Sequence, residues 1–330
     1  MKTPILSLVF YFLMTFTGNA HAEESAMDHI MRAAAFNTGG KFRAAIDEVE
    51  PLLQSDTRSA NDATTGIAWN IRGLALQSLG DGENARRSYD AAIVILRMRP
   101  ERRKQYASAL DNLGSLEQDS GHFVESRSLR MRAQKIYASL GDRAGVARTF
   151  NNLALAAMAQ KRPKEAQQRI ADAFREESLL PAPDVDDLAA FYGTQALEQE
   201  RDGKYEPALH AIQRAIEIWT QRYGPEYYLL ATGYSLRGRA YDGLRDYHDA
   251  IDDMLRSLQL MRSNGESDSR VYFLTEISYA QVLRHAGIKN EAVQTEGGAR
   301  VALSNLRETC ASCLASAESL SSIKITRVTN

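Results

Sequence analysis

The sequence predicts an all-α protein, a right-handed superhelical solenoid of about seven helix pairs closed by a C-terminal capping helix. Two observations predict this class. Small residues recur at positions n, n+12 and n+19, and the whole triplet recurs every 40 to 42 residues along the chain. Glycines followed closely by an aromatic residue recur where a helix would end and the next begin. No stretch carries a comparable alternating pattern of the kind that indicates strands.

The triplets show which residues are expected at the helix contacts. Of their 21 positions, 20 are Ala, Gly or Ser, and Leu52 is the one departure. Two antiparallel helices approach to about 8–10 Å only where the facing side chains are small, so three such columns in register predict closely packed pairs. The triplets are Ala33, Ala45 and Leu52; Gly73, Ala85 and Ala92; Gly114, Ser126 and Ala133; Ala154, Ala166 and Ala173; Ala196, Ala208 and Ala215; Gly238, Ala250 and Ser257; and Ala280, Ala292 and Ala299.

The first 22 residues are predicted to be a signal peptide. Lys2 supplies the positive start, Ile5 to Phe16 is a largely apolar run of 12 residues, and Ala20-His21-Ala22 has the small residues that precede cleavage. Twelve residues of helix span about 18 Å, well short of the roughly 30 Å hydrocarbon core, which argues against a membrane anchor. No cysteine follows the cleavage position for lipid attachment. We therefore expect a periplasmic or secreted mature protein that does not insert into a membrane.

The array is predicted to occupy residues 23–307, with each repeat formed by two helices and a tight turn. Trp69, Gly73 and Leu76 lie at i, i+4 and i+7, which places them on one helical face. The turns are marked by Gly40-Lys41-Phe42, Gly121-His122-Phe123 and Gly203-Lys204-Tyr205. The seven repeats are predicted to start near residues 26, 66, 107, 147, 189, 231 and 273.

These features resemble the tetratricopeptide repeat (TPR), whose pattern is W-x2-L-G-x2-Y followed by A-x3-F in a unit of 34 residues. The resemblance covers about residues 26–307. The longer period, with Leu110-Asp111-Asn112-Leu113-Gly114 and Phe150-Asn151-Asn152-Leu153-Ala154, is most similar to the kinesin light chain type. The sequence departs from the pattern at four turn positions: Gly82 and Pro163 replace the aromatic, and Lys161 and Arg245 replace the glycine.

Two further segments need an interpretation. The stretch from Ser178 to Asp184 contains Pro181 and Pro183 and has the composition of a linker. The step across it, from Ala154 to Ala196, is nevertheless 42 residues, like the next two steps, so we expect an ordinary loop between repeats of one continuous superhelix. Residues 308–330 are expected to form the capping helix and a tail.

The search for catalytic chemistry favours a protein that is not an enzyme and holds no cofactor or metal. Gly40-Lys41-Phe42 lacks the first glycine and the hydroxyl of a phosphate-binding loop. No two histidines of the mature chain have the i, i+4 spacing of paired metal ligands on one helical face. Cys310 and Cys313 are a possible disulfide in an exported protein, with a redox or metal role as the less favoured alternatives.

The TPR resemblance implies a partner site on the first helices of the pairs, which line the concave face of such arrays. The inward positions then include Asn70, Asp111, Asn112, Gln118, Arg148, Asn151 and Asn152. In the family, asparagines at these places hydrogen-bond the backbone of an extended peptide, and an amide suits this task because it carries both donors and an acceptor. Asparagine is a poor helix former, so its mid-helix placement in successive repeats favours recognition over mere solubility.

Charge gives a second indication about partners. The mature chain carries 39 basic and 42 acidic residues once Lys2 is removed, a balance that argues against a nucleic-acid binder. Residues 84–135 carry a net charge of +5, so an acidic partner segment is one reading and a solvated outer face is the other. The basic residues of this stretch are Arg86, Arg87, Arg97, Arg99, Arg102, Arg103, Lys104, Arg127, Arg130, Arg132 and Lys135.

The sequence therefore favours an exported, non-catalytic scaffold that binds a protein or an extended peptide in its concave groove. The alternative is a sensor or regulatory module that reads a peptide or small ligand and changes the shape of the superhelix. An enzyme would require a clustered catalytic set, and the sequence shows none.

Overall fold

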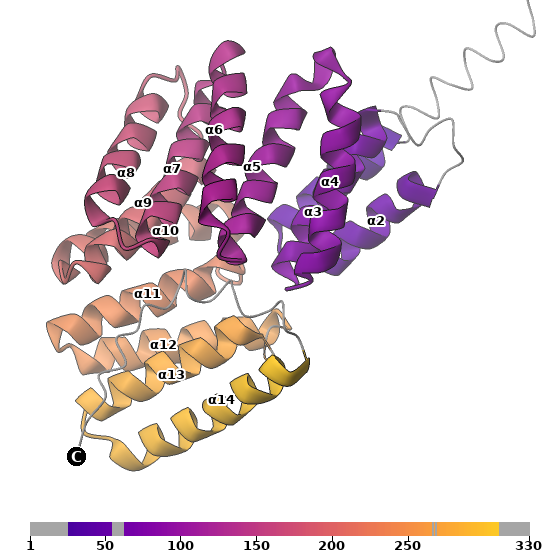
Figure 1. Cartoon of the computed structure of the whole chain (residues 1–330). Helices are drawn as coiled ribbons and strands as arrows, with labels where there is room; N and C mark the ends of the chain where they lie inside the picture. The colour runs from indigo at the N-terminus through magenta and orange to yellow at the C-terminus, as the bar shows by residue number, and fades with distance from the viewer. Residues whose placement is uncertain (1–25, 55–62, 266, 268, 310–330) are drawn as a thin grey trace, which may run out of the picture. The chain divides into compact units, whose positions relative to one another are not determined.

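The computed structural model describes residues 26–54, 63–265, 267 and 269–309, and this part of the chain is helical with no strand (Figure 1). Residues 26–38 are helical and pair with α2 (Phe42–Gln54). Six more pairs follow: α3 (Ala63–Ser78) with α4 (Gly82–Arg97), α5 (Arg103–Asp119) with α6 (Phe123–Ser139), α7 (Arg143–Ala159) with α8 (Pro163–Ser178), α9 (Val185–Arg201) with α10 (Tyr205–Tyr223), α11 (Leu229–Leu244) with α12 (Tyr247–Ser263), and α13 (Arg270–His285) with α14 (Lys289–Thr309). A 3-10 turn, η1 (Pro100–Arg102), precedes α5.

The all-α class and the helix pairs are thus confirmed for the described residues. The small residues of the triplets are all buried, and the alanines and serines among them are at most 1% exposed. Leu52, the one large residue in the frame, is half-buried. The signal at 1–22, the capping segment beyond residue 309, and Cys310 and Cys313 lie outside the described residues.

The unusual turns form despite their residues. Lys161 and Arg245 adopt the left-handed backbone conformation, with φ of 58° and 66°, where the other turns have glycine. The residue after each donates the same backbone hydrogen bond as in the glycine turns, from Arg162 N to Ala157 O at 2.9 Å and from Asp246 N to Tyr241 O at 3.0 Å. The bonds of the turn offset the roughly 1 kcal/mol cost of a side chain in this conformation.

The chain comprises two compact units, Met1–Ala109 and Leu110–Asn330. Their boundary falls inside α5 and not at the loop with Pro181 and Pro183, which lies within the second unit between α8 and α9. Continuity of one superhelix from residue 23 to 307 stays a prediction. None of the described helices is both long enough and apolar enough to span a lipid bilayer.

Candidate functional site

The first helices of the pairs form one side of the second unit. α7 contacts α9, α9 contacts α11, and α11 contacts α13, whereas the second helices α8, α10 and α12 make no comparable contact with one another. In a curved stack of helix pairs, the helices on the inner side are the closer ones. The half-buried side chains of these first helices, together with those of α5 from Leu110 onward, are called the first-helix face below.

A series of polar contacts links each first helix of this unit to the next. We call it the polar ladder, and its members join residues 39 to 43 positions apart, one repeat along the chain. The contacts are Asn152 Nδ2 to Asp111 Oδ2 at 2.8 Å, Arg148 Nη1 to Asp187 Oδ2 at 2.8 Å, Arg239 Nε to Glu200 Oε1 at 3.3 Å, and His285 Nδ1 with Asp242 Oδ1 at 2.8 Å. The ladder fixes polar side chains on the face where a partner was predicted.

The buried side chain of Arg130 on α6 supports the first step of the ladder, the contact between Asn152 and Asp111. Its side chain is 1% exposed, and its guanidinium donates to Gln118 Oε1 at 2.6 Å, to the backbone carbonyl of Asn152 at 2.8 Å and to Ser115 Oγ at 3.0 Å. Its Nε lies 3.8 Å from Asp111 Oδ1. Burial raises the pKa of Asp111, against the attraction of the Arg130 charge. One cation therefore holds side chains of α5 and the backbone of α7 in place.

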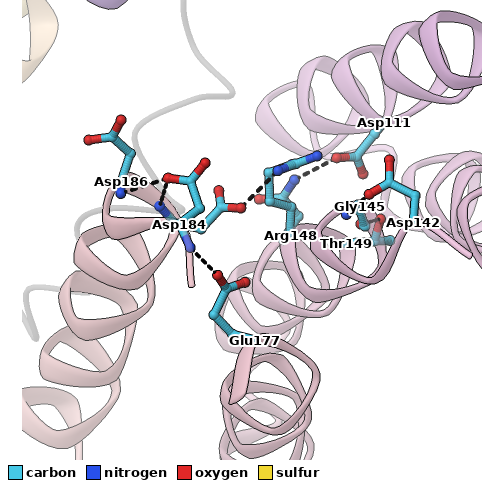
Figure 2. A network of polar contacts seen from close by, with 10 residues as sticks. Asp111, Asp142, Gly145, Arg148, Thr149, Glu177, Asp184 and Asp186 are labelled. Carbon is cyan, nitrogen blue, oxygen red and sulfur yellow. Dashed lines mark hydrogen bonds and ion pairs between the residues drawn. The ribbon is translucent and has the colours of Figure 1, made fainter. Parts of the chain in front are cut away.

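The second step joins α7 to the first turn of α9 (Figure 2). Arg148 is 38% exposed and pairs with Asp187, which is 12% exposed. Asp184 caps α9 by accepting from the backbone N–H of Asp187, and its own N–H donates to Glu177 Oε1 at 2.6 Å. Burial raises the pKa of Asp187 to about 6; the Arg148 charge opposes this shift, and Asp184 and Glu177 add to it. The Asp187 carboxylate thus pairs with a partly exposed guanidinium, and two further carboxylates lie near enough to raise its pKa.

The structure separates the sequence-predicted site residues into two groups. Asp111, Gln118 and Asn151 are 8%, 7% and 6% exposed, so they are buried beneath the first-helix face. Asp111 and Gln118 position other side chains through Arg130, as described above. The Oδ1 atom of Asn151 makes no hydrogen bond with the described residues.

The remaining predicted residues are half-buried. Asn112, Arg148 and Asn152 lie on the first-helix face of the second unit, and the last two belong to the polar ladder. Asn70 lies in the first unit on α3, where its Nδ2 is 3.5 Å from Ser108 Oγ of α5. Only the half-buried residues present side-chain surface to solvent, and the buried Asp111 and Gln118 lie beneath them.

Sequence reasoning missed Arg130, Asp187 and Glu177. Arg130 belongs to the basic stretch that the sequence assigns either to an acidic partner or to a solvated outer face, and its burial excludes this one residue from both readings. One signal was available: Arg130 follows the small residue Ser126 by four positions, which places it on the packed side of its helix. The side chain of Asp187 contacts Arg148 of α7. The side chain of Glu177 accepts from the backbone N–H of Asp184 in the loop after α8. The spacing of residues within one helix reveals neither contact.

Comparison with known proteins agrees with this architecture. The family described as Tetratricopeptide repeat matches residues 187–263, which span most of α9 to α12. No curated protein matches the sequence. The chain therefore has TPR-like repeats, an architecture typical of protein-interaction scaffolds.

Solved structures of the same fold share little sequence with the chain. A chain of the APC/C hetero-tetramer Cut9-Hcn1 is similar at a TM-score of 0.64 and 14% identity over 88% of this chain, which spans only 49% of that chain. The apo form of RapI is similar at a TM-score of 0.58 and 13% identity, and the match covers 86% of this chain and 99% of that chain. A signal transduction ATPase from Pyrococcus horikoshii with a tetratricopeptide repeat sensor is similar at a TM-score of 0.55 and 12% identity. The match covers 84% of this chain and 42% of that one.

Proposed function

We propose that the protein is an exported, non-catalytic scaffold that binds a protein or an extended peptide along the first-helix face. The observation that carries the proposal is the half-buried set Asn112, Arg148 and Asn152 in the second unit, of which the last two bond buried carboxylates. Side chains whose rotamers are already fixed lose little entropy on binding, so a preorganised face favours recognition. The kinesin light chain type of repeat stays a prediction from the 40 to 42 residue period.

The chemistry of these side chains suits a peptide backbone. Asn152 donates one N–H to Asp111, which leaves the second N–H and the carbonyl oxygen of its amide for a peptide unit. Arg148 uses one nitrogen for Asp187 and keeps further N–H donors on a side chain that is 38% exposed. Donors of this kind suit backbone carbonyls and the carboxylates of an acidic segment.

Affinity capture from the exported fraction tests the binding. The bait is the chain from Glu23 to Asn330, compared with Asn112→Ala plus Asn152→Ala and with the control Lys135→Ala plus Lys164→Ala. The control residues are exposed on the second helices α6 and α8 of the same two repeats. We expect mass spectrometry to identify a protein that wild type and control retain and the asparagine variant loses. Equal retention by all three would place the binding surface elsewhere.

Export is tested separately from binding. The intact protein is isolated from cells after fractionation, and its N-terminal residue is determined. We expect Glu23 as the first residue and recovery outside the cytoplasm. An intact Met1 or Lys2 on cytoplasmic protein would contradict export and would leave the binding proposal to its own test.

A sensor is the second candidate function. It is favoured by the fold likeness to the Pyrococcus horikoshii protein, whose repeats are described as a sensor, and by the Arg148–Asp187 contact between successive repeats. A ligand that took Arg148 from Asp187 would loosen one repeat against the next. Saturable binding of one small ligand with a change in the radius of gyration would favour the sensor, and a stable complex without such a change would favour the scaffold.

A further inference from the structure

Three side chains with metal-binding chemistry converge at the turn between α5 and α6. Glu117 lies in the last turn of α5, His122 precedes the first residue of α6, and Glu125 lies in its first turn. His122 Nδ1 is 2.7 Å from Glu117 Oε2, and one ligand atom from each of the three lies within 4.8 Å of the others. Across the described ranges, no other group of three or more His, Cys, Asp or Glu side chains meets this distance.

The charge at this turn favours a divalent cation. Two carboxylates and a neutral imidazole carry a charge of −2, and Glu117 is fully buried, where an ionised carboxylate gains most from a nearby cation. The C-terminal end of α5 and the N-terminal end of α6 carry opposite partial charges of about half a unit each, so their effects on a cation between them largely cancel. The balance is therefore set by the two carboxylates.

The geometry suits zinc after small side-chain movements. Ligand atoms about 2.0–2.1 Å from a tetrahedral zinc ion lie roughly 3.3 Å from one another. To bind the ion, the 2.7 Å distance between His122 and Glu117 must therefore lengthen, and any pair of ligand atoms near the 4.8 Å limit must move closer. The side chain of His122 is 59% exposed and Glu125 is exposed, so both can rotate without disturbing the core. An imidazole ligand favours zinc over magnesium or calcium, which prefer oxygen ligands only.

We propose that Glu117, His122 and Glu125 bind one Zn²⁺ ion, with water in the fourth position. The ion would tie the end of α5 to the start of α6. The site lies at the turn of a repeat and does not include residues of the polar ladder. His248 offers a matched comparison, because it lies beside Asp249 and Asp252 on one helix but all three side chains are at least 50% exposed.

Zinc binding to the metal-free full chain tests the site directly. Cys310→Ser and Cys313→Ser are present in every protein, because thiolates bind zinc themselves. Equilibrium dialysis against ZnCl₂ with elemental analysis of the protein gives stoichiometry and affinity, and thermal unfolding with and without zinc gives a second reading. The variants are His122→Ala, Glu125→Ala and the control His248→Ala, all at exposed positions, where truncation is expected to leave the fold intact.

We expect one zinc per chain, an affinity that falls at least about tenfold in His122→Ala and in Glu125→Ala, and no change in His248→Ala. Zinc should raise the unfolding temperature of the parent and not that of His122→Ala. The proposal is overturned if the parent binds no stoichiometric zinc, if His122→Ala or Glu125→Ala binds as tightly as the parent, or if His248→Ala alone loses the ion.

Discussion

Replacing Gly73 by alanine should destabilise the first unit, although alanine is the better helix former. Gly73 lies on α3 in the small-residue frame, facing Tyr89 of α4. A Cβ atom at this position would lie 2.6 Å from two carbons of the Tyr89 ring, far inside the 3.4 Å at which ordinary contact begins. Tyr89 is fully buried and its hydroxyl donates to Gln77 Oε1 at 2.8 Å, so the ring cannot simply swing away.

The expected magnitude follows from two opposing effects. Overpacking a well-packed contact by one methyl group costs about 1–3 kcal/mol. The alanine recovers about 0.5–1 kcal/mol in helix propensity. We therefore expect the free energy of unfolding to fall by about 1–2 kcal/mol, because a fully buried ring held at its hydroxyl places the overpacking cost in the upper part of its range.

Gly39→Ala in the same unit is the matched control. Its Cβ would lie 3.4 Å from the nearest atom, at a backbone angle that alanine adopts freely, so the same substitution should stabilise by about 0.4–1 kcal/mol. Urea unfolding is followed by the fluorescence of Trp69 on α3 in a Trp219→Phe background, which confines the signal to this unit. We expect the urea concentration at the unfolding midpoint to fall for Gly73→Ala and to rise for Gly39→Ala. An equal rise in stability for both variants would refute the close helix contact.

Two further predictions concern buried charge in the second unit. Arg130→Ala should lower the free energy of unfolding by about 3–5 kcal/mol, because it leaves Asp111 buried without its cation, whereas Arg127→Ala at an exposed ion pair should cost less than about 1 kcal/mol. Equal losses in the free energy of urea unfolding for Arg130→Ala and Arg127→Ala would contradict this role of Arg130. Between about pH 4 and pH 6 the folded state keeps a proton on Asp187 that the unfolded chain has released, so stability should fall as pH rises through this window. The Asp187→Asn variant has no carboxyl at this position to ionise, so its free energy of unfolding should fall less steeply with pH. Parallel pH curves for the variant and wild type would exclude this contribution of Asp187.

The helix pairs could be predicted from sequence because their contacts are periodic. A position such as Gly114 or Ala154 faces the same neighbour in every repeat, so the same size limit appears at a fixed spacing along the chain. Helix ends were harder, because they depend on single caps. The repeat predicted to start near residue 189 corresponds to a helix that begins at Val185, since the Asp184 side chain accepts from the first backbone N–H groups.

The site was only partly predictable, because the residue types that make its contacts differ from one repeat to the next. The half-buried Asn112 and Asn152 followed from their place in the frame, but the buried Arg130 beneath them belongs to one repeat alone. Glu117 and His122 are five residues apart across a turn, a spacing that carries no signal on a single helix. Such contacts become visible only when the turn is folded.

Site-specific photo-crosslinking tests the central claim most directly, because it reports the binding surface itself. A photoreactive residue replaces Asn112 on the first-helix face or Lys135 on the outside of α6, and each protein is irradiated in the native exported fraction. The proposed function predicts one dominant crosslinked partner from position 112 and none from position 135. A partner captured from position 135 and absent from position 112 would show that binding takes place on the second helices instead.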